Sequence, residues 1–176
     1  MSIDEKIRTK YPIPIAEAYQ SAELENNPQI QVQRWIDLFE ETIRYLSLIG
    51  LSLYRHHDLH DERVEEVQKG LNKPSLGHWL KLFKALVPVL QLVNISNLTP
   101  PLKQKHHNDP ISEAVTGLKN ILSSQIPNTI RTLHLLDTFV EFRNKKIGHG
   151  MMTQTQAELA IQVIRPGLLS WLDQIE

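Results

Sequence analysis

The strongest constraint on the fold is a long stretch, from about residue 29 to 57, in which apolar residues recur at helical spacing. The steps are three and four positions, with one step of seven, and the apolar residues are Val32, Ile36, Phe39, Ile43, Leu46 and Leu53. This period places them on one side of a helix. Gly50 falls within the stripe, where a glycine costs about 1 kcal/mol relative to alanine. We therefore expect a long helix that another helix crosses closely at Gly50.

The rest of the chain also carries helix signals, and strands are not evident. No segment alternates apolar and polar residues between turn signals. Further helices are expected at about 61–70, 76–93, 110–123, 128–147 and 155–174. The sequence therefore predicts an all-α fold, a multi-helix bundle of five to seven helices.

Cap residues and prolines locate several ends of these helices. The expected N-caps are Ser75, Asp109 and Asn128. Pro110 follows one of them at the first helical position, where proline is favoured. Thr155 and Glu158 have the spacing of a capping box before the last helix. Pro88 is expected to kink or end the helix in which it lies.

The N-terminal residues, 1–28, are expected to lie outside the bundle. In the stretch KYPIPI, Pro12 and Pro14 bias the residues before them toward extended conformations. We expect an extended arm here, followed by a short helix at about 16–25. Residues 29–176 are then expected to form one helical bundle domain.

Residue composition excludes several classes of function. The chain has 176 residues with 19 basic and 20 acidic side chains, so only a local patch could attract nucleic acid or an anionic membrane. It has no cysteine, which excludes thiol catalysis, disulfides and cysteine-based zinc sites. The longest uncharged apolar run, YLSLIGLSLY, is too short to span a bilayer, and the charged N-terminus is not a secretory signal. We expect a cytoplasmic protein that makes no use of a membrane.

The stretch RHHDLHDE, residues 55–62, is a weak candidate for a metal site. His56 and His60 are four positions apart, so both could face one ion from a helix. A zinc site needs three or four converging ligands, and the other candidates, His106 and His107, lie in an undefined loop. We expect a solvated helix end and no metal. No phosphate loop, dinucleotide fingerprint or nucleophile elbow is present, so no cofactor is expected.

The stretch FVEFRNKKIGHG, residues 139–150, places polar residues at the end of an apolar helix. On a helical wheel, Arg143 falls in the middle of a stripe formed by Leu133, Leu136, Val140 and Ile147. Arginine rarely faces a core unless something pairs with it. A continuous helix would point His149 away from Arg143, so the two can meet only if the helix stops between them. Gly148 supplies a stop, because glycine readily adopts the left-handed conformation.

Two interpretations of this segment follow from its residue types. A guanidinium binds phosphate bidentately and an imidazole moves protons near neutral pH, so Arg143 and His149 could cleave RNA without metal. Asn144 could orient either group, and Lys145 and Lys146 could hold flanking phosphates. In the other interpretation, these residues only complement the dipole and cap the carbonyls of a helix C-terminus.

The stretch FRNKKIGHG resembles the signature of HEPN domains, which are all-helical modules of prokaryotes and eukaryotes. The motif of that family is an arginine, usually followed by a polar residue, with a histidine about four to six positions later. Arg143, Asn144 and His149 match this motif. The motif also sits where that family has it, at the end of one long helix and before the last. The resemblance covers about residues 29–174.

This resemblance implies a bundle that pairs about a two-fold axis, with the Arg143 and His149 motifs of both subunits lining one cleft. Many members are metal-independent ribonucleases of toxin, antiphage or RNA-processing systems. Others are inactive and serve as interaction or sensing modules. We therefore expect a homodimer with RNA, a nucleotide or a protein such as an antitoxin as partner. Two hypotheses stay open: an endoribonuclease that uses 2'-hydroxyl attack, and a catalytically inactive dimerisation, interaction or ligand-sensing module of a bacterial regulatory system.

Overall fold

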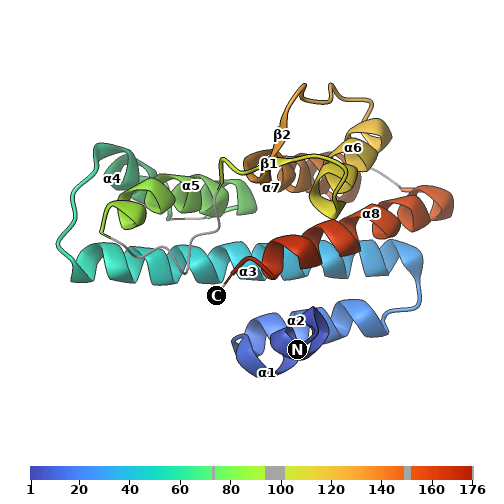
Figure 1. The fold of residues 1–176 in the computed structure, drawn as a ribbon, viewed down its shortest axis with the longest axis horizontal. Coiled ribbons are helices and arrows are strands. Elements are labelled where there is room, and N and C mark those ends of the chain that lie inside the picture. The colour runs from blue at the N-terminus through green and yellow to red at the C-terminus, as the bar shows by residue number, and fades with distance from the viewer. Residues whose placement is uncertain (73, 94–101, 149–151, 176) are drawn as a thin grey trace. The chain divides into compact units, whose positions relative to one another are not determined.

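The computed structural model describes residues 1–72, 74–93, 102–148 and 152–175. In chain order its α-helices are α1 (Ile3–Lys10), α2 (Ile13–Leu24), α3 (Pro28–His56), α4 (Glu62–Lys69), α5 (Leu76–Leu92), α6 (Pro110–Ile121), α7 (Thr132–Phe142) and α8 (Gln154–Leu172) (Figure 1). A π-helical turn, η1 (Arg143–Ile147), continues α7. The expected all-α, multi-helix class is confirmed.

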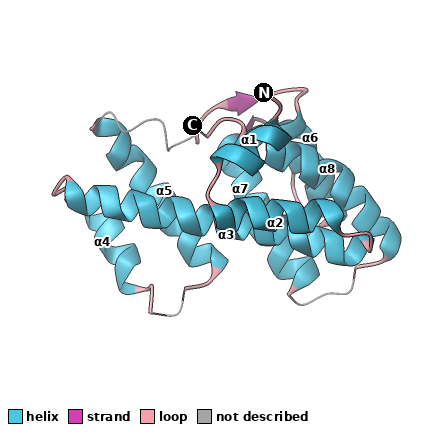
Figure 2. Cartoon of the chain, turned by 90° about the horizontal axis from the view of Figure 1, so that it is seen from below, coloured by secondary structure: helices cyan, strands magenta, loops and turns pink. Residues whose placement is uncertain are grey.

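The strands of the described residues are limited to one short ribbon (Figure 2). β1 (Lys105–His106) and β2 (Ile130–Arg131) pair antiparallel, with Lys105 opposite Arg131 and His106 opposite Ile130. A backbone hydrogen bond of 3.1 Å from the Thr132 amide to the Gln104 carbonyl oxygen continues this pairing. The ribbon therefore joins the segment before α6 to the start of α7.

The chain divides into two compact units. Unit 1 contains residues 1–41 and 103–174, and unit 2 contains residues 42–102 and 175–176. The boundary between the units falls within α3, so it does not coincide with the expected division at residue 28.

The N-terminal segment forms two helices, so the expected extended arm is wrong. Ser2 caps α1, because its hydroxyl oxygen accepts a hydrogen bond of 3.2 Å from the Glu5 amide. Pro12 is the N-cap of α2, and Pro14 lies in the first turn. A proline there removes no intrahelical hydrogen bond. The two prolines thus start a helix, and the described chain has eight α-helices where five to seven were expected.

Helices α3 to α6 begin within two residues of their expected positions, but α7 starts later. Asn128 is not its cap, because Ile130 and Arg131 are engaged in the ribbon and the first helical residue is Thr132.

One further boundary differs from expectation. The cap of α8 is Thr153, whose hydroxyl oxygen accepts a hydrogen bond of 3.2 Å from the Gln156 amide, and not Thr155. Helix α5 ends at Leu92, one residue before the expected end, and of the two effects expected of Pro88 it does not end the helix.

Aromatic rings form the centre of unit 1. The Phe39 ring lies 5.0 Å from that of Phe139 and 6.0 Å from that of Trp171, in edge-to-face geometry. Tyr19 and Trp35 make a similar contact with ring centroids 6.0 Å apart. These contacts join α2, the first half of α3, α7 and α8, and each such pair contributes about 0.5–1.5 kcal/mol beyond its buried area.

Glycines allow α6 and α8 to cross closely within unit 1. A Cβ atom on Gly167 would overlap the Cβ atom of Ala114, and one on Gly117 would lie 2.9 Å from a Val163 methyl carbon. The close approach therefore depends on the missing side chains. This crossing holds α6 and α8 together. These two helices precede and follow α7 and the Arg143 segment along the chain.

Unit 2 packs the second half of α3 with α4 and α5. Its buried core consists of Tyr54, Val64, Leu82, Leu86, Val89 and Leu90. A Cβ atom on Gly50 would lie 3.2 Å from Leu86 Cδ1 and 3.3 Å from Leu90 Cδ1, so α5 crosses α3 closely at this glycine, as predicted. Within the described ranges, no helix combines the length and the apolarity needed to cross a lipid bilayer.

Candidate functional site

The Arg143 segment forms a π-helical turn. The Gly148 amide donates a hydrogen bond of 2.9 Å to the carbonyl oxygen of Arg143, five residues earlier. Turns of this kind are rare, and they occur frequently at functional sites. The prediction that the helix stops at Gly148 is confirmed, since η1 ends at Ile147.

The conformation of Gly148 differs from the expected one. Its backbone angles are φ −77° and ψ −31°, in the ordinary right-handed region, so the left-handed stop is wrong. The π-helical hydrogen bond satisfies the Arg143 carbonyl oxygen without a left-handed residue. His149, the expected base, lies outside the described residues.

Arg143 lies beside the buried face of α7 and not in the middle of it. The buried residues of this helix are Thr132, Leu135, Leu136, Thr138, Phe139 and Phe142, whereas the expected stripe residues Leu133, Val140 and Ile147 are half-buried. The two phenylalanine rings set the rotation of the helix, because aromatic rings bury the most apolar area. The expected core-facing position is therefore wrong, and the Arg143 side chain is half-buried.

The guanidinium of Arg143 contacts the neighbouring Asn144. Its Nη1 atom donates a long hydrogen bond of 3.5 Å to the Asn144 side-chain oxygen. Among the residues that the structure describes, Arg143 makes no ion pair. An accessible guanidinium without a carboxylate keeps its full capacity to bind an anion.

Glu141 holds two of the nearby cations. Its carboxylate accepts hydrogen bonds of 2.5 Å from Lys119, 2.8 Å from Lys145 and 2.8 Å from the Ser124 hydroxyl. Burial alone would raise the pKa of Glu141, but these hydrogen bonds lower it from 4.5 to about 2. Lys145, an expected RNA contact, is therefore already paired. Lys146, the other one, has no ion pair within the described part of the chain.

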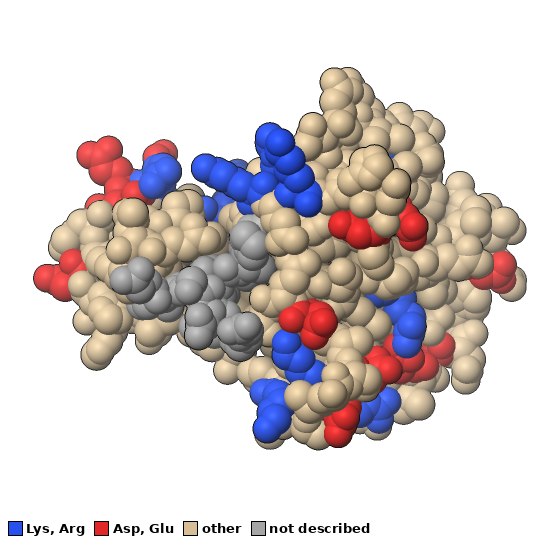
Figure 3. Space-filling view, viewed as in Figure 1, with Lys and Arg blue, Asp and Glu red and all other residues tan. Residues whose placement is uncertain are grey.

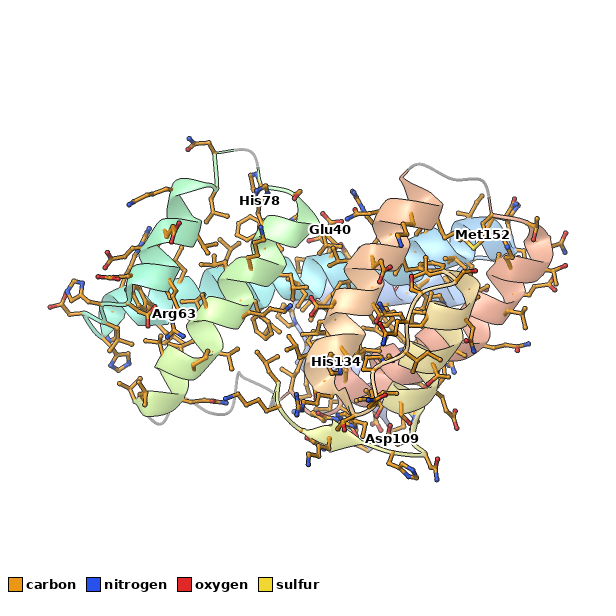
Figure 4. The ribbon with its side chains drawn as sticks, turned by 90° about the horizontal axis from the view of Figure 1, so that it is seen from above. Glu40, Arg63, His78, Asp109, His134 and Met152 are labelled. Atoms are coloured by element: carbon orange, nitrogen blue, oxygen red, sulfur yellow. The ribbon has the colours of Figure 1, made fainter. Side chains whose placement is uncertain are left out.

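A second polar cluster was not expected from the sequence. The His106 ring is 3% exposed, with Nδ1 2.8 Å from an Asp109 carboxylate oxygen and Nε2 2.9 Å from the Thr132 hydroxyl. Asp109 lies where the loop after β1 enters α6 (Figure 4). Burial alone would raise the pKa of Asp109, but hydrogen bonds from Ser112 and His106 lower it.

This His106 cluster has the groups of a nucleophile triad, but it is a structural brace. A triad hydroxyl must reach a substrate. Thr132 is 0% exposed, so its hydroxyl is inaccessible. The cluster ties β1 to the starts of α6 and α7. Asp109 is recognisable as a cap from sequence, but nothing in the sequence links His106 to Thr132.

The His56 segment does not gather metal ligands. Helix α3 ends at His56, so His60 does not share a helix face with it. The two His60 ring nitrogens lie 3.7 Å from an Asp58 oxygen and 3.5 Å from a Glu65 oxygen. The described residues contain no group of three or more side chains that could hold a metal ion.

Comparisons of the chain with protein-family models, with curated proteins and with solved structures find no match.

Proposed function

We propose that the Arg143 segment binds a phosphodiester and that the chain is a HEPN-like, metal-independent endoribonuclease. The observation that carries this proposal is the pairing of charges around α7 and η1. Glu141 pairs with Lys119 and Lys145, whereas Arg143, two residues further on, has no carboxylate partner within the described residues. A free guanidinium fork binds the oxygens of a phosphate in two parallel hydrogen bonds.

The π-helical turn supports the same proposal. Its hydrogen bond joins the amide of Gly148, the residue before His149, to the carbonyl oxygen of Arg143, which carries the guanidinium. Asn144 accepts a hydrogen bond from Arg143 and would fix the orientation of its fork. Lys146 has no ion pair in the described ranges and would hold a flanking phosphate. Lys145 would act only indirectly, through Glu141.

The reaction would use the RNA 2'-hydroxyl as the nucleophile. One His149 would take the proton of this hydroxyl, and the 2'-oxygen would bond to the adjacent phosphorus. The bond from phosphorus to the 5'-oxygen would break, leaving a 2',3'-cyclic phosphate and a 5'-hydroxyl. Arg143 would stabilise the negative charge that grows on the phosphate oxygens. In the expected homodimer, His149 of the second copy would protonate the leaving 5'-oxygen.

The second candidate function is a catalytically inactive dimerisation, interaction or ligand-sensing module. The observation that favours it is the neutralisation of Lys145 by Glu141, in a chain whose net charge is already −1. Proteins that bind RNA rely on several unpaired cations for affinity. In this case Arg143 would bind a partner or stabilise the end of its helix.

RNA cleavage by matched variants tests the proposal. Labelled single-stranded RNA is incubated in EDTA with the wild type, Arg143→Ala, His149→Ala and Arg34→Ala. Arg34 is a suitable control, because it is an exposed arginine of unit 1 whose pairing with Asp37 lies on the surface. We expect both motif variants to lose about a hundredfold or more in rate, with unchanged melting temperature, and the control to keep its rate. A wild type that cuts no RNA would favour the inactive module instead.

A further inference from the structure

A polar groove lies beside the ribbon in unit 1, at the opposite end of α7 from Arg143. We call it the ribbon groove; its accessible polar lining consists of Lys105, His107, Asn108, Thr116, Asn128 and Thr129. Its volume is about 450 Å³, within the range of small-molecule sites. The eleven-residue α7 separates the two ends by about 16 Å, so this site is independent of the proposed ribonuclease site.

The ribbon groove has a cationic side, and none of its described lining residues carries a carboxylate. Lys105 lines the groove and lies directly opposite Arg131 in the ribbon. Like charges at directly opposite positions destabilise a strand pair. Neither residue makes an ion pair within the described chain, and no Asp or Glu lines the groove. Lys and Arg side chains gather over the ribbon on the face shown in Figure 3. An anion bound here would remove the repulsion between the two cations.

The rest of the lining suits a hydroxylated molecule. Asn108, Thr116, Asn128 and Thr129 offer amide and hydroxyl groups that, in the described residues, have no side-chain hydrogen bond of their own. Among the described residues, no Phe, Tyr or Trp ring lines the groove, so a nucleobase would find none of these aromatic surfaces for stacking. The chemistry of the lining therefore favours a sugar or polyol over a base.

The walls of the groove are held in place before any ligand arrives. His106 lies in the lining between Lys105 and His107, and its ring is fixed by Asp109 on one side and Thr132 on the other. This cluster locks the ribbon onto the starts of α6 and α7. A site with fixed walls loses less entropy on binding than a site that must first become ordered.

We propose that the ribbon groove binds a small phosphorylated sugar or polyol. Lys105, with Arg131 beside it, holds the phosphate, and the amides and hydroxyls of Asn128, Thr129 and Thr116 hold the sugar. Binding requires no chemical step. It gives the chain a ligand site separate from the Arg143 segment, whether or not that segment cleaves RNA.

Calorimetric titration of the full chain with three probes tests this proposal. The probes are ribose 5-phosphate, ribose and inorganic phosphate, and the variants are Lys105→Ala, Asn128→Ala and Lys10→Ala. Lys10→Ala removes the same charge at an exposed position of α1, away from both proposed sites, and serves as the matched control. We expect ribose 5-phosphate to bind at least about tenfold more tightly than either other probe. Lys105→Ala should weaken it about tenfold or more, and Asn128→Ala severalfold.

Three results would overturn the proposal. One is the absence of ribose 5-phosphate binding at millimolar concentration. Another is inorganic phosphate binding as tightly as the sugar phosphate, which would leave no role for the hydroxyl-binding side. The third is equal weakening by Lys105→Ala and Lys10→Ala. The RNA assay separates the two sites, because Lys105→Ala should cut RNA at the wild-type rate if the chain is a ribonuclease.

Discussion

The Gly148 amide bonds to the carbonyl oxygen of Arg143 at 2.9 Å, and so closes a π-helical turn over the five residues that carry the candidate site. An α-helix would bond this amide to the carbonyl of Asn144, four residues earlier. The wider turn satisfies the Arg143 carbonyl oxygen and ends the helix with every residue in a right-handed conformation. The glycine is therefore not needed for its backbone freedom.

Replacing Gly148 by alanine tests this account of the turn. An added Cβ atom would lie 3.4 Å from the Asn144 carbonyl oxygen, and the φ of −77° suits any residue. We expect Gly148→Ala to keep the fold and to raise the free energy of unfolding by about 0.4–1 kcal/mol, because alanine restricts the unfolded chain. Urea unfolding measures the change. A loss of more than about 1 kcal/mol would show that the turn requires glycine.

The charge cluster around Glu141 predicts a dependence of stability on pH. Its pKa of about 2 in the folded chain lies below the ordinary value of 4.5. The stabilisation it provides is therefore complete above about pH 4.5 and is lost as the pH falls through about 2. Glu141→Gln should lower the free energy of unfolding at pH 7 by roughly 1–3 kcal/mol and make it less dependent on pH between 4.5 and 2.

Urea unfolding at several pH values between 7 and 2 measures this effect. Glu113→Gln is the control, because Glu113 is an exposed carboxylate of α6 without an ion pair among the described residues. Equal pH dependence in the wild type and Glu141→Gln would contradict the charge pairing.

Long-range features of the fold were less predictable than local ones. The period of residues 29–57 predicted α3 almost to the residue, because one of its faces is apolar and the others are polar. Helix α7 carries apolar residues on most of its faces, so a helical wheel allows more than one buried side. Burial of the Phe139 and Phe142 rings decides between them, and the Phe139 ring contacts Phe39 of α3, a partner that no local pattern encodes.

The same limit applies to the candidate site. The sequence singled out Arg143 and Asn144, and the structure places their side chains in contact. The sequence did not indicate that Glu141 would pair with Lys119, 22 positions earlier. It also did not indicate that the same carboxylate would pair with Lys145. The π-helical turn also has no residue signature, because it depends on a hydrogen-bond register and not on a side chain.

The crossing of α6 and α8 predicts a large effect of one added methyl group. Gly167→Ala would place its Cβ atom closer to that of Ala114 than two nonbonded carbon atoms can approach, so one backbone must move. We expect a loss of about 1–3 kcal/mol or more in the free energy of unfolding. Gly77→Ala is the control, because the nearest atom to its added Cβ is the Ser75 hydroxyl oxygen at 3.7 Å. Thermal unfolding of both variants checks the prediction, which a stable Gly167→Ala would contradict.

The brace at His106 predicts separable effects on stability and on activity. Thr132→Val keeps the side-chain shape but leaves the buried Nε2 atom of His106 without its partner. We expect the free energy of unfolding to fall by about 1–3 kcal/mol. Thr129→Val, at an exposed position, should change it by less than about 0.5 kcal/mol. Any RNA cleavage should persist in Thr132→Val below its melting temperature; specific loss of cleavage would mean that the hydroxyl is catalytic.

A composite cleft requires two copies of the chain. The proposal predicts a homodimer of twice the 20.3 kDa chain mass, with the Arg143 segment at or beside the interface. Light scattering across a dilution series measures the mass. A monomer at high micromolar concentration would argue against a site built from two subunits.

Cleavage of chimeric oligonucleotides tests the central proposal most directly. Each substrate is 2'-O-methylated except at one ribonucleotide, a panel moves this ribonucleotide along the strand, and the reactions contain EDTA. The account predicts cuts only after the single free 2'-hydroxyl, with 2',3'-cyclic phosphate and 5'-hydroxyl ends, and no cut in the fully methylated strand. Cleavage of the fully methylated strand, or no cleavage of any chimera or of unmodified RNA, would contradict it.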